Sequence, residues 1–277
     1  MSLIETALRR MQEGAKRPGA ESDPRRTSGR TVDRGGDAVR RAEPEGPVQT
    51  YLPATVDPTV MELNCILPQM DDEVARRAYK ILRTRLLQRL ATNQWYTLAL
   101  TGTQAQQGKT TTAINLAIAL AQDVQTSVFL VDLDLPRPRV ASYLGLKFDS
   151  GLGEYLSGEV EIDKIIYESG IPRLAIIPNS RPMPHSSELL SSPRMTTLLK
   201  TLAASAPRRI TIFDMPPLLL ADDVLAFAPN IDGVLLVATE GATTRSSLQS
   251  AKELLAEMNV VGVILNRSSE RTESYDY

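Results

Sequence analysis

A lysine and two threonines follow a glycine where the sequence predicts the start of a helix, and this spacing suits polyphosphate binding. The stretch Gly108-Lys109-Thr110-Thr111 lies within the segment QAQQGKTTT. In such a loop, backbone N–H groups and the helix N-terminus bind phosphates, the lysine reaches the β/γ-phosphates, and the hydroxyl after it binds Mg²⁺. The strict pattern G-x-x-x-x-G-K-[ST] is not met, because Thr103 stands where its first glycine belongs. The alternative is an ordinary strand–helix turn with an exposed lysine.

Aspartates close two predicted strands after this loop. Asp132 and Asp134 end the run VFLVDLD, and Asp214 ends ITIFD. Unbroken apolar runs are typical of central parallel strands, whose carboxyl ends open on the ligand crevice. Such carboxylates can hold Mg²⁺ or its waters, and one can accept a proton from an attacking nucleophile. We therefore predict Lys109, Asp132 and Asp134 as catalytic residues, and Thr110, Asp132 and Asp214 as metal ligands. For each aspartate alone, a helix N-cap is the alternative.

The composition narrows the class of protein. The chain has 277 residues and a formal net charge of −2, which argues against a nucleic-acid binder driven by bulk charge. Cys65 is the only cysteine and His185 the only histidine, which excludes an internal disulfide and a multi-histidine metal site. No apolar run approaches the roughly 20 residues that span a bilayer, so we expect a soluble protein.

Strand and helix patterns alternate through most of the chain, which predicts an α/β fold with a doubly wound, mostly parallel sheet. Residues 1–70 are predicted to be a mostly disordered extension with a short amphipathic helix at 1–12, followed by a domain at 71–268 and a flexible tail at 269–277. The expected strands are at about 95–101, 127–132, 173–178, 209–214, 233–238 and 260–265. The expected helices are at about 71–91, 109–122, 137–144, 151–168, 187–204, 222–228 and 243–258. The first of these is expected to turn Val74, Ala78, Ile81, Leu82 and Leu86 inward.

Five segments in order carry a resemblance to a known family over about residues 72–267. They are QGKTTTAINLA, VFLVDLDLPRP, FDMPPLLLADD with its further acidic residue Asp223, HSSELLSSPRM and VVGVILNR. The chain resembles the bacterial tyrosine kinases (BY-kinases) of exopolysaccharide and capsule export, within the wider P-loop ATPase group. The opening MSLIETALRR is also similar to the start of tyrosine autokinases found beside exosortase-linked polysaccharide systems.

The resemblance implies a function and its participants. ATP would transfer its γ-phosphoryl group to tyrosines of a C-terminal tail, here Tyr275 and Tyr277, with Mg²⁺ as the cofactor. Asn266 and Arg267 follow the last predicted strand, where the wider group commonly contacts adenine, and Arg194 is a further candidate for a phosphate contact. The implied partner is a membrane-spanning polysaccharide chain-length regulator, which would hold a cytoplasmic protein at the inner face of the plasma membrane. A homo-oligomer is possible, and no nucleic-acid partner is expected.

The sequence departs from the family at three places. Gln106 replaces a usual glycine, and if that position takes a positive φ the glutamine costs about 1 kcal/mol. Arg77, Lys80 and Arg83 occupy the positions of the family's E-x-x-R-x-x-R, so the acid that helps to join subunits into rings is missing. The tail also offers two tyrosines rather than many. Two alternatives therefore stay open: a partitioning-type ATPase switch with water as acceptor, and a degenerate nucleotide-binding scaffold of an export complex.

Overall fold

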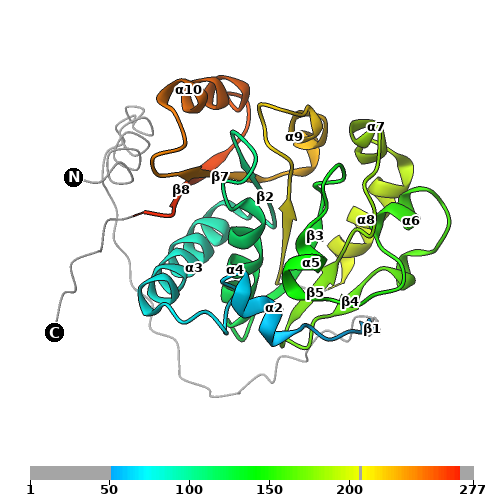
Figure 1. The fold of residues 1–277 in the computed structure, drawn as a ribbon. Helices are drawn as coiled ribbons and strands as arrows, with labels where there is room; N and C mark the ends of the chain where they lie inside the picture. Colours follow the sequence, from blue (N-terminus) through cyan, green and yellow to red (C-terminus); the bar gives the residue numbers. More distant parts are fainter. Residues whose placement is uncertain (1–50, 206–207, 269–277) are drawn as a thin grey trace, which may run out of the picture. The chain divides into compact units, whose positions relative to one another are not determined.

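The computed structural model describes residues 51–205 and 208–268 (Figure 1). The predicted helix at 1–12, most of the predicted extension and the predicted acceptor tyrosines lie outside these residues. The described part begins with ordered elements about 20 residues before the domain boundary predicted at 71. Strand β1 (Leu52–Pro53) pairs with β4 (Tyr167–Glu168), and helix α2 (Pro58–Leu63) is capped by Asp57, whose carboxylate accepts from Thr59 N at 2.9 Å.

Eight strands form one sheet in the order β1-β4-β5-β3-β6-β2-β7-β8. All neighbours pair in parallel except β4 and β5, which are antiparallel. The six longer strands are β2 (Thr97–Gly102), β3 (Ser127–Asp132), β5 (Leu174–Ile177), β6 (Arg209–Asp214), β7 (Gly233–Thr239) and β8 (Val260–Asn266). The predicted fold class is confirmed, and these six strands lie within about two residues of their predicted positions.

Helices cover both faces of the sheet, because successive residues of its buried strands point to opposite sides. Leu98 and Leu100 belong to the core beneath α3 and α4, whereas Ala99 between them belongs to the other core, with residues of α8 and α10. Figure 1 shows α3 and α4 on the near side of the central strands. The helices after α2 are α3 (Glu73–Asn93), α4 (Lys109–Ala121), α5 (Val140–Leu144), α6 (Leu152–Leu156), α7 (Ser186–Leu190), α8 (Pro193–Ala204), α9 (Asp223–Phe227) and α10 (Arg245–Leu254).

Two helix predictions were wrong in their extent. The helix expected at 151–168 ends early: Gly158 takes a φ of +81°, and the segment continues through a 3₁₀ turn into β4. The helix expected at 187–204 is divided, because Ser192 caps a new helix and Pro193 occupies its first turn. Both interruptions come from local chemistry that apolar periodicity does not register.

The inward face of α3 also differs from the prediction. Val74 and Ile81 are 55% and 46% exposed, while Leu86 and Leu90 reach the core. Tyr79 packs against the same core from this helix. A helix with apolar residues on more than one side has no unique amphipathic face, so its rotation is set by packing against α4.

Candidate functional site

The phosphate-binding loop predicted from the sequence lies between β2 and α4. Helix α4 begins at Lys109, and Gly108 before it takes a φ of +80°. A Cβ atom built on Gly108 would lie 2.0 Å from Nδ2 of Asn266, so the loop requires glycine here for both its backbone and its close approach to β8. The N-terminus of α4 therefore opens at the carboxyl edge of the sheet, where a helix dipole favours an anion.

Gln106 adopts the left-handed conformation in which its replacement of a glycine has a cost. Its φ is +62°, and its side chain is exposed. The backbone of the loop thus keeps a conformation suited to glycine at a position that carries a glutamine. The strain of such a conformation is about 1–2 kcal/mol for a residue with a Cβ.

The carboxylates predicted from two separate segments come together beside this loop. Asp132 and Asp214 are paired neighbours at the ends of the adjacent strands β3 and β6, and both side chains are buried. Thr110 Oγ1 donates to Asp214 Oδ2 at 2.6 Å, which joins the first turn of α4 to the end of β6. Burial raises the pKa of both Asp134 and Asp214, and the positive charge of Lys109 opposes that rise, so its ammonium lies within electrostatic reach of both.

Burial dominates the electrostatics of the three aspartates. Loss of hydration raises the pKa of Asp214 to about 7, against the opposing effects of Thr110 and Lys109. Burial, followed by the negative charge of Asp214, raises the pKa of Asp132 well above its usual range. The pKa of Asp134 is also raised, again chiefly by burial. Such a cluster is best stabilised by a cation that compensates the carboxylates.

The two aspartates of VFLVDLD have different surroundings. Asp132 Oδ2 accepts from Arg139 N and Val140 N, each at 2.9 Å, so this side chain satisfies the start of α5. Its other oxygen, Oδ1, is buried and makes no hydrogen bond. Asp134 accepts from Arg137 N at 3.2 Å and is 9% exposed. The N-cap alternative thus applies in part to Asp132, while Asp134 keeps some access to solvent.

A fourth carboxylate belongs to the same region, although the sequence analysis noted it only within the resemblance. Asp223, the first residue of α9, is 1% exposed, and its Oδ1 is buried without a hydrogen bond. Its negative charge contributes to the raised pKa of Asp134. The pair of aspartates in LLLADD was the available signal, but sequence alone does not tell which of the two turns inward. Asp222 is exposed.

The fit of a magnesium ion can be judged from the polar atoms of the site. Asp132 and Asp214 each keep a buried Oδ1 without a hydrogen bond, and the Thr110 hydroxyl lies beside Asp214. Within the described residues, no three His, Cys, Asp or Glu side chains could hold a metal ion together. The site therefore suits an ion that keeps water molecules and phosphate oxygens among its ligands, as Mg²⁺ usually does in proteins.

The other residues predicted to bind the nucleotide or its phosphates have the following surroundings within the protein. Asn266 Nδ2 donates to the carbonyl oxygen of Gln107 at 3.1 Å, and Arg267 follows β8 with a φ of +55°. Thr111 lies half-buried in the first turn of α4. Arg194 is engaged away from the loop: its guanidinium lies 4.9 Å from the centre of the Tyr155 ring.

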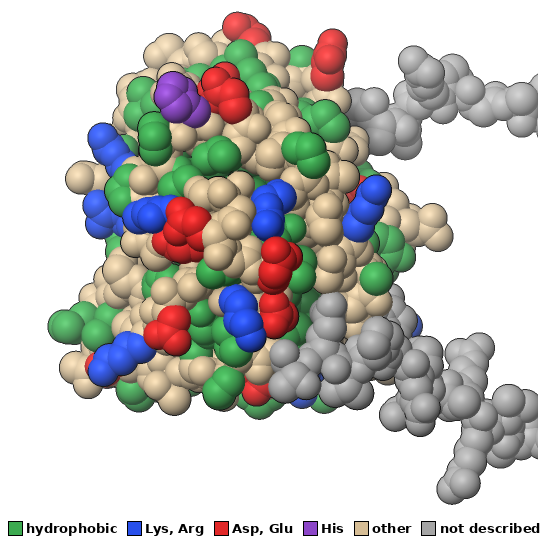
Figure 2. Space-filling model, turned by 90° about the vertical axis from the view of Figure 1, so that its right-hand side faces the viewer, with side chains coloured by type: hydrophobic (Ala, Val, Ile, Leu, Met, Phe, Trp, Pro, Cys, Tyr) green, Lys and Arg blue, Asp and Glu red, His purple; other side chains and the backbone are tan. Residues whose placement is uncertain are grey.

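The face that carries α6 and α7 mixes charges of both signs (Figure 2). Arg181 pairs with Glu154 at 3.5 Å and also with Glu159, and Arg194 lies 3.3 Å from Glu161. Basic and acidic side chains therefore lie beside each other on the side that Figure 2 shows. Exposed pairs of this kind contribute little to stability, and they leave no broad basic surface on this view.

The fold and the loop define a P-loop nucleotide-binding protein. The family model described as the CobQ/CobB/MinD/ParA nucleotide binding domain matches residues 98–276. The chain belongs to this family, and within it to the bacterial tyrosine-protein kinases, because relatives of that name match it over most of its described length. The resemblance of residues 72–267 to the bacterial tyrosine kinases is confirmed.

Three relatives illustrate the match. Tyrosine-protein kinase CpsD of Streptococcus agalactiae serotype Ia is 30% identical over 181 residues, 64% of this chain and 77% of the relative. Tyrosine-protein kinase YwqD of Bacillus subtilis is 29% identical over 220 residues, 78% of this chain and 92% of the relative. Tyrosine-protein kinase etk of Escherichia coli K12 is 32% identical over 206 residues, 73% of this chain but only 28% of that longer relative.

Solved structures agree with the sequence matches. The kinase domain of Escherichia coli tyrosine kinase ETK superposes with a TM-score of 0.65 and 29% identity, covering 77% of this chain and 84% of that one. The septum site-determining protein MinD of Pyrococcus horikoshii, solved with Mg-ADP, superposes with a TM-score of 0.54 and 21% identity, covering 64% of this chain and 72% of that one. The second likeness shows the fold alone.

Proposed function

We propose that this chain is an ATP-dependent protein-tyrosine autokinase that transfers the γ-phosphoryl group of ATP to Tyr275 and Tyr277. One observation carries the proposal: the loop that ends in Lys109 and Thr110 faces the carboxylates at the ends of β3 and β6. Phosphoryl transfer depends mainly on positioning and charge stabilisation, and this arrangement supplies both at one edge of the sheet.

Each part of the loop has an assigned task in the transfer. The N-terminus of α4 and the backbone N–H groups bind the phosphates, and Lys109, which is 7% exposed, reaches the β/γ-phosphates. The Thr110 hydroxyl, Asp132 and Asp214 would hold the magnesium ion directly or through water. When bound, Mg²⁺ neutralises charge that develops on the phosphate oxygens. Asn266 and Arg267 are proposed to reach the adenine base.

We assign the proton acceptor for the tyrosine hydroxyl to Asp134 in preference to Asp132. Asp134 is 9% exposed against 0% for Asp132, and one oxygen of Asp132 is occupied by two backbone N–H groups. The hydroxyl proton passes to the carboxylate, the phenolic oxygen attacks the γ-phosphorus, the bond to the β-phosphate oxygen breaks, and ADP leaves. The raised pKa of Asp134 makes its carboxylate a better proton acceptor than an exposed aspartate would be.

The biological setting of the proposal rests on the resemblance. We propose that the kinase regulates polysaccharide synthesis or export at the inner face of the plasma membrane, through a membrane-spanning chain-length regulator. No helix within the described part of the chain is long and apolar enough to cross a membrane.

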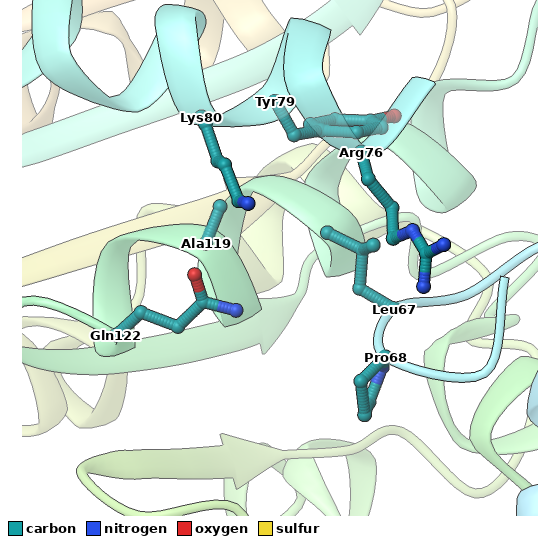
Figure 3. A pocket seen from close by; sticks show the side chains of 7 residues that line it. All are labelled: Leu67, Pro68, Arg76, Tyr79, Lys80, Ala119 and Gln122. Carbon is teal, nitrogen blue, oxygen red and sulfur yellow. The ribbon is translucent and has the colours of Figure 1, made fainter. Parts of the chain in front are cut away.

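The mode of self-association is proposed to differ from that of the family's rings. Arg83 turns towards α4, where it donates to Gln122 Oε1 at 3.1 Å. Arg76 and Lys80 lie beside a small hollow between α3, α4 and the Leu67–Pro68 turn (Figure 3). A helix face with this excess of basic residues repels a second copy of itself at the same contact.

Incubation of the full chain with Mg-ATP, followed by mass-spectrometric mapping of phosphotyrosine, tests the activity. We expect label on Tyr275 and Tyr277, loss of label in Lys109→Ala, and loss of at least tenfold in rate in Asp134→Asn. Tyr96→Phe is the matched control, because Tyr96 is 49% exposed directly before β2 and its substitution should leave the label unchanged.

Two results would contradict the proposal. ATP binding without any labelled tyrosine would favour a nucleotide-dependent scaffold. Phosphate release that is unchanged when both tail tyrosines are replaced by Phe, again without label, would favour an ATPase switch with water as acceptor.

A further inference from the structure

A buried glutamine of the phosphate loop links that loop to a distant connection of the sheet. Gln107 is 3% exposed, and its side-chain oxygen accepts from Gln104 N at 3.0 Å. Its amide nitrogen donates to Thr103 Oγ1 at 3.0 Å and to Thr243 Oγ1 at 2.7 Å. The side chain thus closes the loop upon itself and reaches the β7–α10 connection, 136 positions further along the chain.

The partners of Gln107 are themselves fixed. Thr243 Oγ1 accepts from Thr239 N at 2.7 Å, at the end of β7. The carbonyl oxygen of Gln107 accepts from Thr239 Oγ1 at 3.2 Å and from Asn266 Nδ2 at 3.1 Å, at the end of β8. Two neighbouring strand ends therefore hold the backbone of the loop, while the glutamine amide joins it to the connection that follows β7. A satisfied and buried polar network of this kind rigidifies the structure around it.

These hydrogen bonds matter because the loop lacks two glycines, one that belongs to the strict P-loop pattern and one that the kinase family usually has. Thr103 and Gln106 occupy their positions, and Gln106 holds a left-handed φ of +62°. A loop with a strained residue keeps its conformation only if surrounding contacts over-determine it. The side chain of Gln107 is placed to do so, since it follows Gln106 directly and is hydrogen-bonded to Thr103 and Gln104, which precede Gln106.

We propose that Gln107 is a positioning residue for nucleotide binding, whose amide holds the phosphate loop ready through Thr103 and Thr243 before ATP arrives. The inference rests on the proposed nucleotide site and deepens it, because it assigns affinity for the triphosphate to a side chain that does not itself contact phosphate. A loop that is ordered in advance loses less conformational entropy when the nucleotide binds, so this ordering raises the affinity for the nucleotide. A restraint of this type acts equally on bound substrate and transition state, which changes KM more than kcat.

Isothermal titration of the full chain with ADP, and initial rates of autophosphorylation over a range of Mg-ATP concentrations, test the proposal. Here kcat is the initial rate at saturating ATP and KM is the ATP concentration that gives half of it. Gln107→Met keeps the length of the side chain and removes all three hydrogen bonds, and we expect the dissociation constant and the KM to rise at least tenfold, with kcat within threefold of the wild type. Thr243→Val should weaken binding about threefold to tenfold. The double variant should be weaker by less than the product of the two single effects, because both substitutions remove the Gln107–Thr243 hydrogen bond.

The control is Gln88→Met, the same chemical change at an exposed glutamine of α3. Nucleotide affinity in this control should match that of the wild type. Measurements are made well below each variant's melting temperature, so that a loss of stability alone leaves the dissociation constant unchanged.

Each outcome is decisive for one of the two claims. If wild type fails to bind ADP, the proposed function fails. If wild type binds and Gln107→Met binds within twofold of it, or if the effects of Gln107→Met and Thr243→Val simply add, the positioning role is overturned.

Discussion

Replacing Gln106 by glycine should stabilise this protein, although glycine usually destabilises. The position has a φ of +62°, and its exposed side chain makes no hydrogen bond within the described part of the chain. A left-handed conformation costs a residue with a Cβ about 1–2 kcal/mol, and glycine avoids that cost. Against this, glycine adds about 0.5–1 kcal/mol of conformational entropy to the unfolded chain. The net expectation is a gain of about 0.5–1 kcal/mol in the free energy of unfolding.

Urea denaturation of the full chain without nucleotide measures this difference. A gain of that size corresponds to a rise of roughly 1–4 °C in melting temperature for a domain of this length. Gln88→Gly is the matched control, because Gln88 is exposed within α3, where glycine should cost about 1 kcal/mol. The same substitution is thus predicted to raise the free energy of unfolding at position 106 and to lower it at position 88. A Gln106→Gly variant that is no more stable than wild type would refute the assignment of strain to this residue.

Three further predictions concern the charged groups of the site. Since burial raises the pKa of Asp214 to about 7, the folded protein without nucleotide keeps a proton that the unfolded chain releases above about pH 4. The free energy of unfolding in EDTA should therefore fall as pH rises from about 4 to about 7, and Asp214→Asn should flatten this slope. Lys109→Ala should weaken ATP binding at least a hundredfold, measured by calorimetry, without a comparable loss in the free energy of unfolding. A variant that binds ATP as tightly as the wild type would contradict the phosphate contact of Lys109. Asp223→Asn should lower the pKa of Asp134 in a carboxyl NMR titration, because a negative charge is removed, whereas Asp222→Asn should not.

Much of the fold could be predicted because its central strands are apolar without interruption. A strand such as β3 or β6 is buried on both faces, so its residue types identify it without knowledge of its neighbours. The loop before α4 was also recognisable, since Gly108 and Lys109 carry their local signal in sequence. The short elements were harder to predict. Strand β4 has two residues, and its pairing with β1 and β5 is a tertiary contact that a local pattern of residues does not indicate.

By itself, the sequence determined which segments end in carboxylates and which segment is predicted to bind phosphate, because these properties follow from neighbouring residues along the chain. Only the tertiary structure decided which contacts each of these side chains makes and which of them are buried. Asp132 uses one oxygen at the start of α5, Asp223 rather than Asp222 turns inward, and Gln107 meets Thr243 at the carboxyl edge of the sheet. Such outcomes depend on hydrogen bonds and burial between residues far apart in the chain, which no local pattern of residue types records.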